Sequence, residues 1–174
     1  MLTGKKIVLG VSGGIAAYKM ANVASMLSKL HADIHVVMTE NATHFITPET
    51  FEVLTGNHCY TDTFDRCMEL HVPHIALGTQ ADAILIAPAS ADVVGKIANG
   101  IADDMLTTCV LPATCPVMLA PSMNVHMYEN PIVQDNMKKL ASYGYEIIEA
   151  DEGYLACRDI GKGKLPPEHV LVDY

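Results

Sequence analysis

The 174-residue sequence has few basic residues: 11 lysines and arginines stand against 20 aspartates and glutamates, which gives a net charge of -9 at pH 7. Contacts to a phosphate backbone need clustered Lys and Arg, so this balance argues against a nucleic acid or an anionic membrane surface as partner. The densest basic cluster is only Lys162 and Lys164, with Arg158 nearby. The sequence also lacks an apolar stretch of the roughly 18–20 residues that cross a bilayer, and its N-terminus lacks a signal-peptide core.

Cysteine is too scarce, and too irregularly spaced, for a disulfide framework or a zinc site. The five cysteines are an odd number, and none of them forms a C-x-x-C pair. We therefore expect a cytoplasmic protein with reduced thiols and without a metal site. Most of these cysteines are expected to be small buried side chains.

Short apolar runs alternate with helical patterns along the chain. Half of the residues are hydrophobic and 18% are charged, as in a globular protein of one domain. Strands are predicted at 5–10, 33–38, 82–87, 116–120 and 145–149. Helices are predicted over an apolar face from Ala16 to Leu30, at 48–55, 74–80, 90–98, 103–111 and 130–143, and after Pro166. The pattern predicts a single α/β domain over 1–174, with three layers and a doubly wound, Rossmann-like or flavodoxin-like parallel sheet.

Residues 150–167 break this alternation, because they contain three glycines, two prolines, charges and no apolar period. A loop of this length in a compact domain is either functional or disordered. Its centre is Tyr154-Leu155-Ala156-Cys157, which is apolar and carries a thiol. We therefore favour a functional flap over disorder.

The stretch GVSGGIAAYK, residues 10–19, follows the first predicted strand and leads into a helix. It is neither a dinucleotide fingerprint, since its glycines fall at 10, 13 and 14, nor a P-loop, since Lys19 lies between Tyr18 and Met20. Glycines let a backbone approach a ligand, Ser12 adds a hydroxyl, and a helix N-terminus favours an anion. The alternative is an ordinary turn between strand and helix that binds nothing.

Three further strand ends carry small polar residues, at 39–41, 88–92 and 121–124. Ligands of open α/β sheets bind outside the carboxyl ends of the strands. Together with the glycine-rich turn, these strand ends favour a planar polar cofactor that carries a phosphate.

Four segments in this order, GVSGGIAAYK, PASADVVGKIANGIADDMLTT, APSMNVHMYENP and LACRDIGKGK, resemble the flavin-dependent cysteine decarboxylases. The resemblance covers essentially the whole chain and is greatest to the members that act on phosphopantothenoylcysteine in coenzyme A biosynthesis. It implies FMN as cofactor and a carboxy-lyase that converts phosphopantothenoylcysteine to phosphopantetheine. The implied reaction oxidises the cysteine carbon–sulfur bond with the flavin, releases CO2, and then returns the hydride while a protein group donates a proton.

The resemblance also implies three catalytic residues. His74, in Val72-Pro73-His74-Ile75, matches the active-site histidine, which accepts a proton or holds the thiol. Asn124 matches the residue that hydrogen-bonds the substrate carboxylate, although Asn is also a good helix N-cap. Cys157 matches the proton donor on a substrate-clamp flap at about 150–167, and the alternative for it is a small buried side chain.

Binding residues follow from the same match. The implied FMN contacts are Ser12, Gly13, Thr39, Ser90, Asp92, Thr107, Thr108 and Ser122. The implied substrate contacts are Asn124, Met127, Ala156, Arg158, Lys162 and Lys164, of which the three cations would meet the substrate phosphate. The chain departs from the family pattern at Asp92, where Asn is frequent, at Tyr128, where Trp is found, at Arg158, where Gly is common, and at Lys164, where Arg is common.

The family resemblance implies a homo-oligomer, a trimer or a multiple of trimers, in which segment 96–104 shapes the site of a neighbouring subunit. The end of the chain at Tyr174 leads us to expect the free-standing form, with a separate ligase that makes the substrate. Alternative functions are an oxidative peptidyl-cysteine decarboxylase of the lantibiotic type, a non-catalytic FMN-binding regulator and a flavin prenyltransferase. Cys157 argues against the first, and the combination of His74, Asn124 and Cys157 argues against the second. The segment Pro121–Met127 and the cysteine flap argue against the third.

Overall fold

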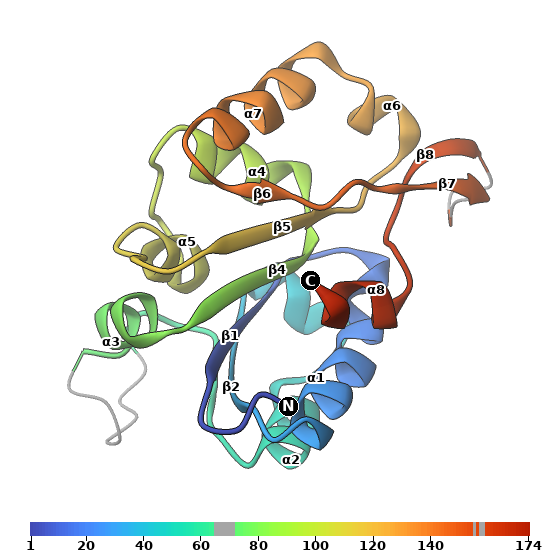
Figure 1. Cartoon of the computed structure of the whole chain (residues 1–174). Coiled ribbons are helices and arrows are strands. Elements are labelled where there is room, and N and C mark those ends of the chain that lie inside the picture. Colours follow the sequence, from blue (N-terminus) through green and yellow to red (C-terminus); the bar gives the residue numbers. More distant parts are fainter. Residues whose placement is uncertain (65–71, 155, 157–158) are drawn as a thin grey trace.

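A computed structural model describes residues 1–64, 72–154, 156 and 159–174 (Figure 1). Two of the predicted site residues, Cys157 and Arg158, lie outside these described residues.

The core of the molecule is a six-stranded parallel sheet with the strand order β3-β2-β1-β4-β5-β6 (Figure 1). The strands are β1 Lys6–Val11, β2 Asp33–Met38, β3 Cys59–Tyr60, β4 Ala83–Ala89, β5 Val117–Pro121 and β6 Glu146–Ile147. The predicted doubly wound α/β fold is confirmed. The order is Rossmann-like, and omission of the two-residue β3 leaves a flavodoxin-like order.

Helices cover both faces of the sheet. They are η1 Ile15–Lys19, α1 Met20–Lys29, η2 Glu40–His44, α2 Pro48–Thr55, α3 Pro73–Gln80, α4 Ala91–Ala98, α5 Met105–Val110, α6 Val125–Tyr128, α7 Pro131–Ser142 and α8 Glu168–Asp173. One apolar cluster joins the sheet to α3, α4, α5 and α7, and a second joins it to α1, α2 and α8. The molecule therefore has the predicted three layers.

The strand order places a topological switch point between β1 and β4. The chain leaves β1 through α1 toward β2 on one side, and leaves β4 through α4 toward β5 on the other side. The two connections diverge at the carboxyl ends of these strands, which opens a crevice there. The glycine-rich turn after β1 and Ser90 after β4 lie at this crevice.

One irregular loop was predicted from the sequence at residues 150–167, and this prediction was wrong. These residues contain an antiparallel hairpin of β7 Asp151–Tyr154 and β8 Ile160–Lys164. The hairpin was not predicted from the sequence because glycines and charges replace the alternating apolar residues that predict a strand. The short elements β3, η2 and α6 were not predicted either.

Two cysteines confirm the expectation of small buried side chains. Cys59 and Cys109 are buried free thiols, and burial raises the pKa of each thiol to about 12. Cys115 is also free and is half-buried. Of the helices in the described part of the chain, none has both the length and the apolar character that a bilayer crossing requires.

Candidate functional site

A cleft of about 470 Å³ lies at the carboxyl edge of the sheet, next to the switch point. Four segments line it: the glycine-rich turn with η1, the start of α4, the connection from β5 to α6, and the β7–β8 hairpin. Three predicted cofactor contacts line this cleft, namely Gly13, Ser90 and Ser122. Four predicted substrate contacts line it too, namely Asn124, Met127, Ala156 and Lys164.

Gly13 is required by the packing of the turn against η2. A Cβ atom at this position would lie 2.5 Å from Asn41 Cβ and 3.0 Å from the Asn41 carbonyl carbon. Gly14 is different, because the nearest atom to its Cβ position is Pro88 Cγ at 3.9 Å. The absence of a side chain at Gly13 therefore lets η2 approach the end of β1.

We expect Gly13→Ala to destabilise the fold and Gly14→Ala to leave its stability near that of the wild type. An overpacked position of this kind costs about 1–3 kcal/mol, which for a chain of this size lowers Tm by roughly 2–12 °C. At Gly14 the backbone is extended, with φ of -171°, so alanine fits there. Thermal unfolding of the cofactor-free proteins measures the difference, and equal Tm values for the two variants would contradict the packing argument.

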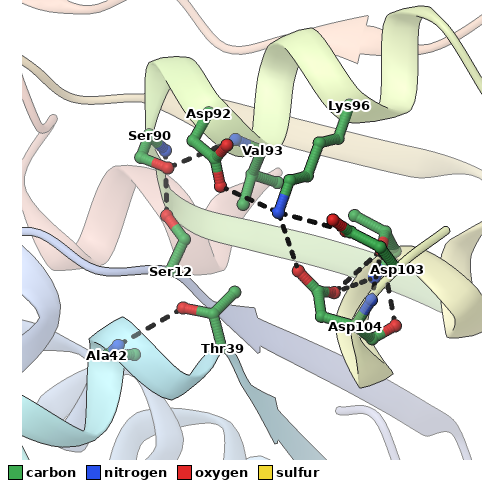
Figure 2. A network of polar contacts seen from close by, with 10 residues as sticks. Ser12, Thr39, Ala42, Ser90, Asp92, Val93, Lys96, Asp103 and Asp104 are labelled. Carbon is green, nitrogen blue, oxygen red and sulfur yellow. Dashed lines mark hydrogen bonds and ion pairs between the residues drawn. The ribbon is translucent and has the colours of Figure 1, made fainter. Parts of the chain in front are cut away.

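Ser12 holds the ends of β1 and β4 together (Figure 2). Its side chain is fully buried, and the hydroxyl donates to the Pro88 carbonyl oxygen at 2.6 Å. The hydroxyl also accepts from the Ser90 N–H at 2.9 Å, the contact that Figure 2 shows. The Ser12 N–H donates to the same carbonyl oxygen at 3.3 Å. Since a serine hydroxyl has one hydrogen to donate, this arrangement gives Ser12 a supporting place beneath the cleft.

Ser90 both caps α4 and lines the cleft. Its hydroxyl oxygen accepts from the Val93 N–H at 3.3 Å, as an N-cap does. The hydroxyl hydrogen has no acceptor within the described residues, so it is available to a bound ligand. The α4 N-terminus, with Ala91 also in the lining, adds the favourable end of a helix dipole for an anion.

The predicted contacts Thr39, Thr107 and Thr108 do not line the cleft and have local partners. Thr39 caps η2 by accepting from the Ala42 N–H at 3.3 Å. Thr107 forms a capping box with Asp104 at the start of α5, and the Thr108 hydroxyl donates to a backbone carbonyl. Their contact with a cofactor remains a prediction.

Asp92, another predicted contact, faces Lys96 rather than the cleft (Figure 2). Lys96 Nζ lies 3.3 Å from a carboxylate oxygen of Asp92, 3.1 Å from one of Asp103 and 3.6 Å from one of Asp104. Partial burial lowers the pKa of Lys96, but the hydrogen bonds to Asp103 and Asp92 outweigh it, so that the pKa is raised above its ordinary value. Lys96 thus ties α4 to the segment before α5, a role that the sequence analysis missed although Asp92 and Lys96 have i,i+4 spacing.

Asn124 is confirmed as a helix N-cap, while its contact with a substrate carboxylate remains a prediction. It is the N-cap of α6, since its Oδ1 accepts from the His126 N–H at 2.8 Å. It also lines the cleft, and its Nδ2 donates to Asp159 Oδ2 at 3.0 Å.

The β7–β8 hairpin packs directly on the chain around Asn124. The Met123 N–H donates to the Gly163 carbonyl oxygen at 3.0 Å. A Cβ atom on Gly163 would collide with the Met123 carbonyl oxygen, and one on Gly161 would lie 2.5 Å from Val125 Cγ2. Gly163 therefore allows its backbone to approach that of Met123, and Gly161 leaves room for the Val125 side chain. Gly163 also has a φ of +136°, which L side chains rarely adopt.

The cations around the cleft differ from the predicted set. Lys164 lines the cleft, whereas Lys162 forms an ion pair with Glu149, and the hydrogen bond to Glu149 raises the pKa of Lys162. Lys19, which was not among the predicted contacts, also lines the cleft, and its side chain makes no hydrogen bond or ion pair with the described residues. Its position at the end of the glycine-rich segment was the available indication.

Large apolar side chains surround the cleft and remain exposed. Ile15, Tyr18, Met127 and Tyr154 all line it, and each is between 48% and 64% exposed. A grouped apolar surface of this kind marks a place that a ligand or another protein surface covers.

His74 does not line the cleft of a single chain. It lies in the first turn of α3, and Figure 1 shows α3 and the β7–β8 hairpin at opposite ends of the molecule. His74 Nδ1 is buried, yet it has no hydrogen-bond partner among the described residues. Buried nitrogens without a partner are rare in folded proteins, and among the described residues His35 Nδ1 is the other side-chain atom of this kind.

Comparison with known proteins gives consistent results. The Flavoprotein family model matches residues 1–174. The chain is 49% identical over 172 residues to the coenzyme A biosynthesis bifunctional protein CoaBC of Bacillus subtilis. The aligned region covers 98% of this chain and 42% of that relative. It thus spans less than half the length of that bifunctional relative.

A second relative matches over most of its own length. The chain is 44% identical over 163 residues to the probable phosphopantothenoylcysteine decarboxylase of Streptococcus mutans, over 92% of this chain and 91% of that protein. Among solved structures, the FMN-dependent cysteine decarboxylase SpaF superposes with a TM-score of 0.85 at 34% identity, over 99% of this chain and 98% of SpaF.

Proposed function

Because this chain belongs to the Flavoprotein family over all 174 residues, we propose that it binds FMN and decarboxylates phosphopantothenoylcysteine to phosphopantetheine in coenzyme A biosynthesis. The observation that carries the proposal is the cleft, where the glycine-rich turn, Ser90, Asn124 and the β7–β8 hairpin meet. The Streptococcus mutans relative, named as a probable decarboxylase of this substrate, supports it at 44% identity over nearly its whole length.

The described residues fit an FMN molecule. The cleft volume of about 470 Å³ lies within the roughly 300–1,000 Å³ of small-molecule sites. Exposed Ile15 and Tyr18 offer apolar surface to a planar ring, and the Ser90 hydroxyl offers a donor to its polar groups. The glycine-rich turn and the α4 N-terminus suit a phosphate. When bound, FMN supplies the reversible oxidation that turns a cysteine into a group able to lose CO2.

The substrate is held by groups of the chain around the same cleft. The Asn124 amide donates a hydrogen bond to the cysteine carboxylate and carries no positive charge. A cation at this place would attract the carboxylate strongly and so oppose the departure of CO2. Among the described residues, Lys164 and Lys19 are the cations that line the cleft, and we assign them to the substrate phosphate. Cys157, next to the cleft-lining Ala156, donates the proton that completes the saturated product.

The proposed enzyme is a homo-oligomer, and a homotrimer follows from the family resemblance. His74 and Asn124 lie apart in one chain, so a complete catalytic set requires a second copy to bring His74 to the cleft. The exposed apolar surface around the cleft supports such a contact. We further propose that the protein is cytoplasmic and that a separate ligase supplies its substrate.

One alternative function has a specific observation in its favour. SpaF, which is named only as an FMN-dependent cysteine decarboxylase, superposes on this chain with a TM-score of 0.85, and an oxidative decarboxylation of peptidyl cysteine is the alternative that this similarity leaves. The sequence identity of 34% is lower than the 44% to the Streptococcus mutans relative, and Cys157 has no role in an oxidative reaction.

The decisive experiment mixes the purified protein with phosphopantothenoylcysteine and determines the product mass. Loss of CO2 alone is the expected result. Loss of CO2 together with two hydrogens would favour the oxidative, peptide-modifying class. An unchanged substrate mass with yellow, FMN-loaded protein would favour a non-catalytic regulator.

A further inference from the structure

The side-chain amide of Asn124 is fixed from two sides. Its oxygen accepts from the His126 N–H at 2.8 Å, and its nitrogen donates to Asp159 Oδ2 at 3.0 Å. A flipped amide would turn its NH2 group toward the His126 N–H and its oxygen toward the carboxylate, so both contacts would become repulsive. The two partners together therefore determine the orientation of the Asn124 amide, with its oxygen toward α6 and its NH2 group toward the hairpin.

Asp159 belongs to the hairpin, whereas Asn124 lies in the connection between β5 and α6. Asp159 directly precedes β8, and β8 lies against α6 through the Met123–Gly163 hydrogen bond and the close approach of Gly161 to Val125. The Asn124–Asp159 contact thus forms at the same junction as the contacts that seat the hairpin. The orientation of the amide and the position of the hairpin depend on each other.

We propose that Asp159 is a positioning residue, which holds the Asn124 amide in its donor orientation and makes that orientation depend on a seated hairpin. The inference rests on the proposed function, in which the Asn124 N–H meets the substrate carboxylate. Loss of Asp159 removes one of the two contacts that oppose a flipped amide, so the carbonyl oxygen would turn toward that carboxylate more often and binding in the productive pose would weaken. A hydrogen bond to a charged group of this kind corresponds to about tenfold to a hundredfold in kcat/KM.

The test is a double-mutant cycle on the FMN-loaded enzyme with Asp159→Ala, Asn124→Ala and the double variant. Asp159→Ala should lower kcat/KM for phosphopantothenoylcysteine, and in the Asn124→Ala background it should cause no further loss. Asp159→Asn keeps an acceptor oxygen and should recover much of the activity. Asp151→Ala is the matched control, since it removes an exposed carboxylate from the same hairpin. If Asp159→Ala does not fold, Asp159→Glu, which displaces the carboxylate by one methylene, replaces it.

Hydrogen exchange of the cofactor-free proteins gives a readout that does not depend on catalysis. Asp159→Ala should speed exchange of the Met123 and His126 amides, which are bonded to Gly163 O and Asn124 Oδ1, while Asp151→Ala should not. Equal exchange in the two variants, or losses of kcat/KM by Asp159→Ala and Asn124→Ala that multiply, would overturn the inference. An inactive wild type would refute the proposed function instead, and the exchange comparison would still decide the role of Asp159.

Discussion

His74→Asn is expected to bind FMN as the wild type does but to form product roughly 10²–10⁴ times more slowly, the range of a general acid–base residue. The imidazole is partly buried at the start of α3, with Nδ1 lacking a partner among the described residues. Asparagine retains a similar polar shape but cannot exchange a proton near neutral pH. Flavin absorbance and the rate of product formation measure the two halves of the prediction. His169→Asn, at an exposed position on α8, is the control.

The same variant tests whether His74 acts in the cleft of another subunit. Co-expressed His74→Asn and Asn124→Ala chains form mixed oligomers in which about a quarter of the composite sites carry both intact residues. Activity well above that of either variant is therefore expected. Mixed oligomers as inactive as the parents would show that both residues of a site come from one chain, and near-normal turnover of His74→Asn alone would remove His74 from the mechanism.

Cys157→Ser is expected to change the product rather than merely to slow its formation. A serine hydroxyl is a much weaker acid than a thiol, so the variant should fail to protonate the decarboxylated substrate. The released compound should then be lighter than phosphopantetheine by two hydrogens, which mass spectrometry detects directly. Cys157 itself lies outside the described residues, and the residue that precedes it in the sequence, Ala156, lines the cleft.

Cys115→Ser is the matched control for the loss of a thiol. Cys115 is half-buried and lies just before β5, at the opposite edge of the sheet from the cleft. The Cys115→Ser variant should therefore still form phosphopantetheine, the saturated product. Clean formation of phosphopantetheine by Cys157→Ser would show that another group donates the proton. Complete inactivity with FMN bound would place Cys157 before the loss of CO2 instead of after it.

Sequence alone predicted the fold because local patterns decide it. The helix at 48–55 was predicted with the bounds that the structure has, since Pro48 begins it and Gly56 ends it at a φ of +75°. The apolar runs of the central strands have no alternative to burial on both faces of a parallel sheet. The hairpin escaped prediction because β8 is seated by the close approach of Gly161 and Gly163, and glycines carry no apolar pattern.

Sequence also located the cleft, because polar residues after parallel strands necessarily gather at one edge of the sheet. It did not determine which of these residues face the ligand. The Ser12 hydroxyl bonds Pro88, whereas Ser90 keeps a hydrogen for the cleft, although both are serines at strand ends.

The basic residues make the same point. Lys162 pairs with Glu149, while Lys164 and the unexpected Lys19 line the cleft. A hydroxyl or an ammonium group can hydrogen-bond a neighbouring backbone group, contact a carboxylate or face a ligand. The residue type alone does not tell which of these three contacts it makes. The tertiary structure decides among them, because only the folded chain fixes which partner lies within hydrogen-bond distance.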